Sequence, residues 1–253
     1  MVVVYWFLAG FPGIWWLLGA AFVILLAVVM SNLAPILILP LFFKLKPLAD
    51  EELVRRLTEL TQRAGKKVRG AFTMDLSSKS TTANAALMGW GSTRRIVLSD
   101  TLLHKYSPEE IEVVLAHELG HHAHNDIGKL IAVQSAFIVV GFYLVDLVLR
   151  ASVPKMGFSG ISDVAAFPLL ALVIGAFALL LQPLTNAYSR HIESEADDYA
   201  IRMTGNPDAF ISMMSKLADQ NLSEAQPSRW VEIFFYDHPP YRKRVERAQA
   251  YSR

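Results

Sequence analysis

The chain has 253 residues, a formal net charge of +1 and no cysteine, and 53% of its residues are hydrophobic. The lack of cysteine excludes disulfides, thiolate metal sites and cysteine nucleophiles. The small net charge, without a basic run, argues against a nucleic acid as partner. The hydrophobic content exceeds that of an ordinary soluble protein, and we ask first where in the chain it lies.

Three apolar stretches hold most of this excess. Residues 13–43 carry no charge and would extend about 46 Å as one helix, so we expect tilting, protrusion or a kink near Pro35 or Pro40. Residues 130–149 and 164–184 form two further stretches of about twenty residues. Buried helices of a large soluble protein are the alternative, which nearly uncharged runs of this length disfavour. We therefore predict three transmembrane helices.

The distribution of basic residues predicts the orientation in the membrane. The loop between the second and third apolar stretches contains only Lys155. The segment after the first stretch contains many more: Lys44, Lys46, Arg55, Arg56, Arg63, Lys66, Lys67 and Arg69. Because basic loops remain on the cytoplasmic side, we expect the hydrophilic parts to face the cytoplasm. The first twelve residues lack the features of a secretory signal and look like the end of another apolar helix.

Compact structure is expected between the first two apolar stretches. Apolar residues at helical spacing predict an amphipathic helix that starts after Asp50 and stops at Gly65. Alternation in residues 67–77 predicts a half-buried strand. Residues 83–91 and 94–99 then read as a β-hairpin.

A helix with a clear start follows the hairpin. Ser107 and Pro108 precede two glutamates, which is the pattern of a capping serine with proline at the first helical position. No helix breaker follows until Asn125. Residues His117 and His121 are therefore one turn apart on one helix face.

The stretch from His117 to His121 reads His-Glu-Leu-Gly-His. In the H-E-x-x-H pattern the two histidines hold zinc, and the glutamate, here Glu118, acts as general base on the zinc-bound water. The alternative is a pair of histidines on an ordinary helix surface. His124 lies about 10 Å from His117 along the axis, too far to share a tetrahedral ion, so the third ligand must come from elsewhere. For His104, His122 and His191 we expect only surface roles.

Acidic residues follow the third apolar stretch on the same predicted helix, which ends at Gly205. One of their carboxylates can complete a zinc site while another orients a histidine. An ordinary solvated helix face is the alternative. Spacing alone does not choose among the four candidates: Glu193, Glu195, Asp197 and Asp198.

These motifs together resemble the integral-membrane zinc metalloproteases that include the CAAX prenyl endopeptidases and HtpX. The resemblance rests on H-E-L-G-H, on the later E-S-E-A-D, and on three further stretches that look like the CAAX branch: LAPILILPLFFKLKPL, STTANAALMGWGSTRRIVLSDTLL and HPPYRKRV. It implies one Zn²⁺ per chain, with Glu193 as the third ligand. It also implies that Asp197 contacts a ligating histidine instead of the ion. It covers the chain from about residue 13.

The resemblance also implies residues that handle the substrate. It favours binding of an extended peptide at Asn84 and Ala85, where the alternative is an ordinary hairpin. His238 and Arg244 match an H-P-x-x-x-x-R pattern, whose members stabilise an oxyanion and bind a substrate carboxylate. On sequence alone, His238 with the two prolines that follow it could simply separate two helices.

The predicted fold is a mainly α membrane protein with about three transmembrane helices and a zincin-like cytoplasmic α+β catalytic domain that contains the hairpin. Residues 1–45 form the first transmembrane segment, residues 46–126 the first catalytic part, residues 127–188 two transmembrane helices and residues 189–253 the second catalytic part.

Some features depart from the resembled family. Its CAAX members have seven spans, whereas we count three, so the helices expected before residue 13 are missing from this sequence. An N-terminal truncation is one explanation, and supply of these helices by an oligomer or another chain is the other. Asp126 stands where eukaryotic members commonly have histidine, which suggests a bacterial or archaeal plasma-membrane protein without prenylated substrates. The predicted function is a membrane zinc endopeptidase acting on peptides or membrane proteins. The alternatives are an HtpX-like quality-control protease and a non-catalytic membrane metal-binding protein.

Overall fold

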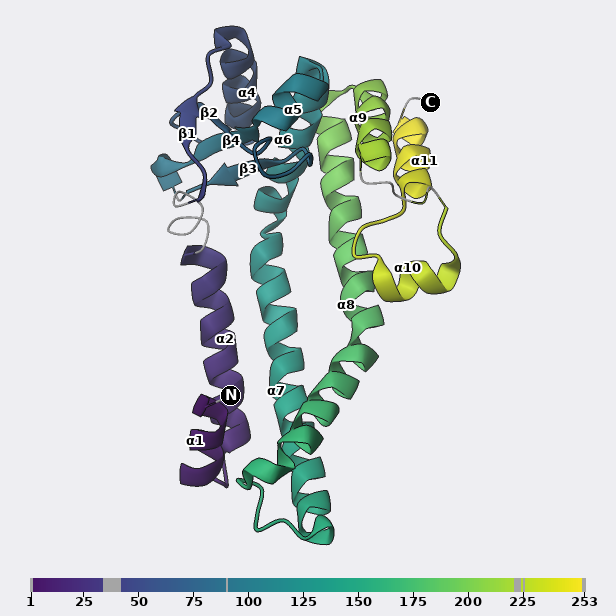
Figure 1. Cartoon of the computed structure of the whole chain (residues 1–253). Coiled ribbons are helices and arrows are strands. Elements are labelled where there is room, and N and C mark those ends of the chain that lie inside the picture. The colour runs from purple at the N-terminus through teal and green to yellow at the C-terminus, as the bar shows by residue number, and fades with distance from the viewer. Residues whose placement is uncertain (1, 34–41, 90, 221–223, 225, 252–253) are drawn as a thin grey trace. The chain divides into compact units, whose positions relative to one another are not determined.

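A computed structural model describes residues 2–33, 42–89, 91–220, 224 and 226–251 (Figure 1). The chain divides into two compact units. The first, which we call the helical unit, comprises Met1–Asn32 and Gly128–Thr185; the second, which we call the mixed unit, comprises Leu33–Ile127 and Asn186–Arg253. Each unit is described by itself.

Long apolar helices form the helical unit. They are α1 (Val2–Gly10), α2 (Trp15–Leu33), α7 (Asp126–Ser152) and the first half of α8 (Phe167–Thr204), with the short 3₁₀ helices η3 (Val153–Met156) and η4 (Val164–Ala166) between α7 and α8. The Nε1–H group of Trp15 donates to Asp146 Oδ1 at 2.5 Å. Arg150 Nε donates to the other oxygen of that carboxylate at 2.8 Å, so the buried acid of α7 is paired.

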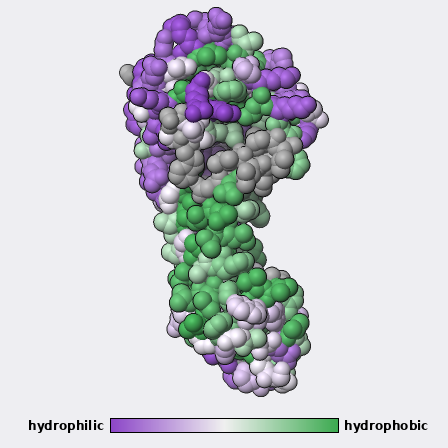
Figure 2. All heavy atoms as spheres, turned by 90° about the vertical axis from the view of Figure 1, so that its left-hand side faces the viewer, coloured by the Kyte–Doolittle hydropathy of each residue, from purple (hydrophilic) through white to green (hydrophobic). Residues whose placement is uncertain are grey.

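The surface of the helical unit is largely apolar (Figure 2). Leu172, Leu179 and Leu180 of α8 are each more than two-thirds exposed. Side chains of this kind need an apolar solvent, and lipid tails provide it.

Two helices are long and apolar enough to cross a membrane, Asp126–Met156 and Val164–Thr204. They contain the second and third stretches predicted from sequence. The first predicted stretch is a shorter apolar helix over Trp15–Ser31 in the described residues, so the count of three transmembrane helices is not confirmed. The kink expected at Pro35 or Pro40 lies outside the described residues. The first residues do form a short apolar helix, α1.

The mixed unit contains a four-stranded sheet. Its strands are β1 (Leu45–Pro47), β2 (Ala71–Met74), β3 (Ala85–Met88) and β4 (Arg95–Ser99), in the order β1-β2-β4-β3. Strands β3 and β4 pair antiparallel, which confirms the predicted hairpin, and the 3₁₀ helix η2 (Gly91–Thr93) lies between them. The parallel pairing of β2 with β4 and the short strand β1 were not predicted.

Seven helical segments accompany this sheet in the described part of the mixed unit. They are α4 (Glu51–Arg63), α5 (Asp100–Lys105), α6 (Pro108–His124), the second half of α8, α9 (Pro207–Gln220), α10 (Arg229–Phe235) and α11 (Tyr241–Tyr251). Of these, α4, α5 and α6 contact the strands of the sheet. The core joins α4, the sheet, α6 and α9 through Leu57, Ile96, Leu115 and Phe210, all essentially inaccessible. This packing holds α6 in place.

The ends of α4 and α6 agree with the predicted caps. Asp50 accepts from the Leu53 N–H at the start of α4. Ser107 and Glu110 form a reciprocal capping box at the start of α6, with Pro108 in the first turn. Asn125 ends α6 in the left-handed conformation, with φ of 55°. The prediction that the third apolar stretch continues without a break to Gly205 is also confirmed, because α8 is one helix of 38 residues.

Candidate metal centre

Helix α6 presents two imidazole rings on one face. His117 Nε2 and His121 Nε2 are 3.1 Å apart. Two imidazole nitrogens this close have the spacing of two ligand atoms bound to the same metal ion. Tetrahedral zinc with Zn–N bonds of about 2.0–2.1 Å separates its ligand atoms by about 3.3 Å.

The carboxylate of Glu193, on α8, meets these nitrogens. Its Oε2 lies 3.3 Å from His117 Nε2, and its Oε1 lies 3.5 Å from His121 Nε2. Glu193 Oε2 is buried and makes no hydrogen bond among the described residues, although a buried carboxylate oxygen normally has a partner. The three side chains form a group that can hold a metal ion. Two imidazoles and one carboxylate at tetrahedral spacing fit Zn²⁺.

Carboxylates also lie behind both rings. Asp197 Oδ1 is 3.0 Å from His117 Nδ1, and Asp126 Oδ2 is 3.0 Å from His121 Nδ1. A ring whose Nδ1–H donates to a carboxylate keeps its Nε2 lone pair for an ion, and its plane is fixed. Arg244 of α11 donates to both oxygens of Asp197, Nε to Oδ2 at 2.7 Å and Nη2 to Oδ1 at 2.5 Å.

The charges at this site favour a bound cation. Burial alone would lower the pKa of His117, but the carboxylates of Asp197 and Glu193 outweigh burial and raise it to about 9. For Glu118, burial is the main cause of a pKa raised above the usual glutamate range, with His117 and His121 acting against it. A carboxylate that holds its proton more readily is suited to accept and return one.

The other acids of the cluster point elsewhere. Glu195 lies 3.7 Å from the exposed His191, one turn earlier on α8, and Asp198 pairs with Arg247 at 2.6 Å. His124 is outside the group that contains His117. It belongs to a second group of metal-capable side chains with Asp126 and Glu195, in which Asp126 is the residue that contacts His121.

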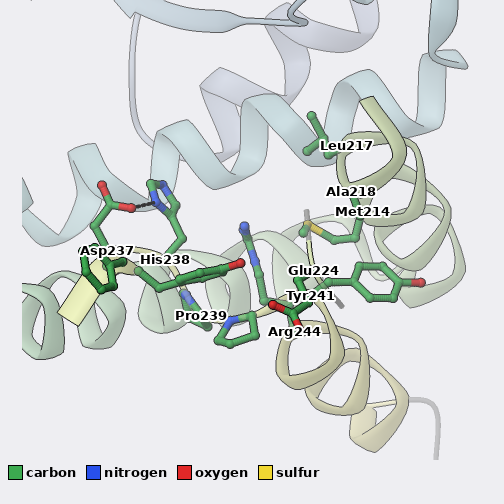
Figure 3. A pocket seen from close by; sticks show the side chains of 12 residues that line it. Met214, Leu217, Ala218, Glu224, Asp237, His238, Pro239, Tyr241 and Arg244 are labelled. Carbon is green, nitrogen blue, oxygen red and sulfur yellow. Dashed lines mark hydrogen bonds and ion pairs between the residues drawn. The ribbon is translucent and has the colours of Figure 1, made fainter. Parts of the chain in front are cut away.

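His238 reaches the centre from the segment before α11. Its Nε2 is 3.4 Å from Glu193 Oε1, and its Nδ1 is 2.9 Å from Asp237 Oδ1. It borders a cavity of about 410 Å³, seen in Figure 3 with Tyr241 and Arg244. An imidazole here can donate to an oxygen close to the metal ligands.

A second cavity adjoins the centre on the side of the sheet. Ala83, Asn84 and Ala85 line it together with His117, Glu118, Glu193, His238 and Arg244. Thus the residues that the sequence analysis selected for substrate binding lie around the same cavity as the metal-binding group. Arg244 reaches this cavity while bonded to Asp197.

Strand β3 is at one end of the sheet, next to this cavity. Ser99 N–H donates to Asn84 O at 2.9 Å, so Asn84 lies at a hydrogen-bonded position of the hairpin. Pairs alternate along an antiparallel ladder, so the backbone N–H and C=O of Ala85 point away from β4. Leu87 is the next residue of β3 whose backbone points away from β4, and His122 forms a hydrogen bond with that backbone.

Some residues that support the site were not selected from the sequence. Arg190 Nη1 donates to the carbonyl oxygens of Glu232 and Tyr236, at 2.9 and 2.6 Å, and holds the segment that leads to His238. Asp126 had been noted only as a departure from the resembled family. Because Asn125 is left-handed, the chain turns there and the Asp126 carboxylate points back to His121. The sequence predicts that the helix ends at Asn125, but it does not predict the direction of the Asp126 side chain.

Comparison with known proteins identifies the class to which this architecture belongs. Residues 47–252 match the model of Peptidase family M48. The match extends over most of the chain, so the chain belongs to Peptidase family M48.

Individual relatives agree with this class. The chain is 30% identical to "Uncharacterized metalloprotease YhfN" of Bacillus subtilis (strain 168), over 98% of this chain and 59% of the relative. It is 34% identical to "CAAX prenyl protease 1 homolog" of Arabidopsis thaliana, over 91% of this chain and 54% of the relative. The crystal structure of S. mikatae Ste24p superposes with a TM-score of 0.85 at 26% identity, covering 98% of this chain and 61% of that one. The chain therefore spans less than two-thirds of the length of each of these relatives.

Proposed function

We propose that this protein is a membrane-embedded zinc endopeptidase with one Zn²⁺ held by His117, His121 and Glu193. The observation that carries the proposal is that the two Nε2 atoms are 3.1 Å apart and that each of them has one oxygen of the Glu193 carboxylate at 3.3–3.5 Å. When bound there, zinc supplies the charge that polarises a scissile carbonyl and acidifies water. Membership of family M48 and the resemblance to CAAX prenyl endopeptidases support the same activity.

The chain's own residues then carry the proton and orient the ligands. Glu118 takes the proton from the attacking water and delivers it to the leaving amine. Asp197 and Asp126 hold the rings of His117 and His121 by their Nδ1 atoms. His238 donates to the oxyanion that develops on the carbonyl carbon.

The substrate is proposed to bind as an extended strand beside β3. The outward N–H and C=O of Ala85 can pair with a peptide backbone, which places that peptide in the cavity that Glu118 lines. Asn84 contacts the substrate at the same edge. Arg244 remains a candidate partner for a substrate carboxylate, and its double hydrogen bond to Asp197 supports a further role in positioning His117.

A different class of function, a non-catalytic membrane metal binder, makes the opposite prediction for one substitution. Glu118→Gln keeps the size of the side chain and all three proposed ligands. If the protein is an enzyme, purified Glu118→Gln should retain zinc and lose cleavage of an unfolded protein substrate by about 100- to 10,000-fold. No cleavage by the wild type, together with a zinc-bound Glu118→Gln variant whose function in the cell is unchanged, would instead favour the metal binder.

Within the endopeptidase proposal, a CAAX-like enzyme and an HtpX-like quality-control enzyme differ in substrate. Asp126 in place of histidine favours a bacterial or archaeal type that does not need prenylated substrates. An assay should compare a prenylated C-terminal peptide with an unmodified unfolded membrane protein, with and without chelator. Cleavage of the unmodified protein alone supports the HtpX-like substrate class.

The catalytic site is proposed to face the cytoplasm, because basic residues follow the first apolar stretch and are rare between the other two. We propose that a second copy or another chain contributes helices around the site in the membrane. Crosslinking in native membranes tests for such a partner.

A further inference from the structure

Helix α10 carries an exposed aromatic face. Trp230 is 73% exposed, Phe235 79% and Phe234 39%. At 3.6 residues per turn these side chains and Val231 lie within an arc of about 140° on the helix surface. Three large aromatic side chains on one side of a seven-residue helix form an apolar patch of the kind that marks a contact surface.

The opposite side of α10 is polar and is tied to the rest of the mixed unit. Lys243 Nζ pairs with Glu232 Oε1 at 2.6 Å. Arg190 donates to the Glu232 carbonyl, and Asn186 Nδ2 donates to the Phe234 carbonyl at 2.8 Å. Figure 1 shows α10 beside α8, the helix to which Asn186 and Arg190 belong. These bonds fix the rotation of α10, so that its aromatic face points outward.

The same bonds fix the level of α10 along α8. Leu184, 59% exposed, ends the apolar stretch of α8, and Asn186 follows two residues later in the same helix. A rise of 1.5 Å per residue places Asn186 about 3 Å and Arg190 about 9 Å beyond Leu184 along the axis. Helix α10 is thus attached where a helix with a lipid-exposed surface turns polar.

We propose that α10 is an interfacial anchor whose aromatic face inserts at the boundary between lipid headgroups and acyl chains. Tryptophan and phenylalanine on one face of a short amphipathic helix are the side chains that this boundary favours. Helix α10 is bonded to Asn186 and Arg190, which follow the apolar stretch of α8 in the same helix, and this identifies the bilayer rather than a soluble protein as the partner of the patch. The inference rests on the membrane location within the proposed function and is independent of zinc or catalysis.

The anchor bears on the active site because the segment after α10 leads directly to it. Phe235 and His238 line the same cavity, and only two residues separate them along the chain. Seating α10 at the membrane surface would hold His238 and the mouth of the cavity at a constant height above the bilayer. A membrane-bound substrate would then meet the cavity at a fixed depth.

The lack of native cysteine makes the test direct. A spin label is attached to Trp230→Cys and, separately, to Phe235→Cys, in the full chain reconstituted in phosphatidylcholine–phosphatidylglycerol vesicles. Collision rates with oxygen, which concentrates in lipid, and with a water-soluble nickel chelate report the depth of each label. Leu179→Cys, at a 71% exposed position of the apolar stretch, and Glu59→Cys, on the exposed side of α4, are the matched lipid and water controls.

We expect both α10 labels to show an oxygen-to-nickel ratio several-fold above that at position 59, and a shallower depth than at position 179. Nickel-dominated collisions at both α10 positions would overturn the proposal. Protection from both reagents would also overturn it, since it would mean that a second protein surface covers α10. Shielding that appears only with an added peptide substrate would assign the patch to substrate binding instead.

Two further comparisons keep the result interpretable. Agreement between the two label positions shows that the outcome does not depend on the loss of one aromatic side chain. Repeating the labelling in a Glu118→Gln background separates this inference from the proposed catalysis. An unchanged collision pattern in this background shows that the anchor does not depend on catalysis. The anchor is then supported whether or not Glu118→Gln loses cleavage as the enzymatic proposal expects.

Discussion

Gly120 and Ala196 are in close contact where α6 and α8 bring the metal-binding side chains together. A Cβ atom placed on Gly120 would lie 3.1 Å from Ala196 Cα and 3.3 Å from Ala196 O. Both residues are in the middle of their motifs, between His117 and His121 and between Glu193 and Asp197. The small side chains at this point allow the two helices to approach closely enough to share one ion.

Gly120→Ala should therefore weaken zinc binding. The added methyl group forces α8 away from α6 and lengthens the distances between Glu193 and the histidines, although alanine favours the helix by about 1 kcal/mol. Competition with a zinc chelator measures the affinity. Gly175→Ala, at a helical glycine with no atom within 4 Å of the added carbon, is the matched control. An unchanged zinc affinity in Gly120→Ala would show that the contact does not set the geometry.

Asp197→Asn should lower zinc affinity by about 10- to 100-fold, because the carboxylate that orients His117 is lost. Arg244→Lys tests whether the guanidinium acts through Asp197, since lysine cannot make the double hydrogen bond. A positioning role predicts weaker zinc binding in Arg244→Lys. If zinc affinity is unchanged and only KM rises, Arg244 contacts the substrate alone.

Ala85→Pro should abolish binding of an extended substrate while preserving the fold. Proline is tolerated on an edge strand where the N–H is outside the ladder, and it removes the donor that a substrate strand would use. We expect kcat/KM to fall at least about tenfold, as the loss of one or more backbone hydrogen bonds implies. Zinc content and thermal stability should stay near wild type. Full activity with an intact fold would exclude strand addition at this edge.

Glu110→Gln should destabilise the protein at neutral pH by about 2 kcal/mol, the scale of hydrogen bonds to a charged group. Burial raises the pKa of Glu110, but Lys216, Ser212 and the Ser107 N–H outweigh burial and lower it. A lowered pKa stabilises the fold above the ordinary glutamate value of about 4.3 and ceases to do so as the pH falls through the folded-state pKa.

Thermal unfolding from pH 7 down to about pH 3, below the ordinary glutamate pKa, checks this prediction. The difference in Tm between wild type and Glu110→Gln should be constant near neutrality and narrow only at the acidic end. Glu109→Gln, which removes a more exposed partner of Arg56, is the control and should have a smaller effect. A Tm difference between wild type and Glu110→Gln that grows as the pH falls would contradict the lowered pKa of Glu110.

Local signals in the sequence predicted most of the elements around the site. Asp50 and Ser107 are side-chain caps, and the segments 83–91 and 94–99 form the predicted hairpin, because caps and turn signals act over a few residues. The parallel pairing of β2 with β4 escaped prediction because it depends on the packing of α4 and α6 against the sheet. The predicted extent of the first apolar stretch is not tested, because residues 34–41 lie outside the described residues.

At the candidate site, the helical spacing of His117 and His121 was readable, whereas the choice of Glu193 among four acids was not. That choice came from the family resemblance, and in the structure only Glu193 of these four meets both Nε2 atoms. The contacts of Arg190, Asp126 and Arg244 join residues of different elements. Their partners are set by the tertiary fold, which no local spacing encodes.

Zinc analysis of the purified protein tests the central claim most directly. Elemental analysis combined with X-ray absorption should find one zinc per chain, with two imidazoles and one carboxylate among its ligands, in wild type and in Glu118→Gln. Glu193→Ala should lose most of this zinc at the same protein concentration. Full zinc occupancy with an unchanged ligand set in Glu193→Ala would contradict the proposed centre.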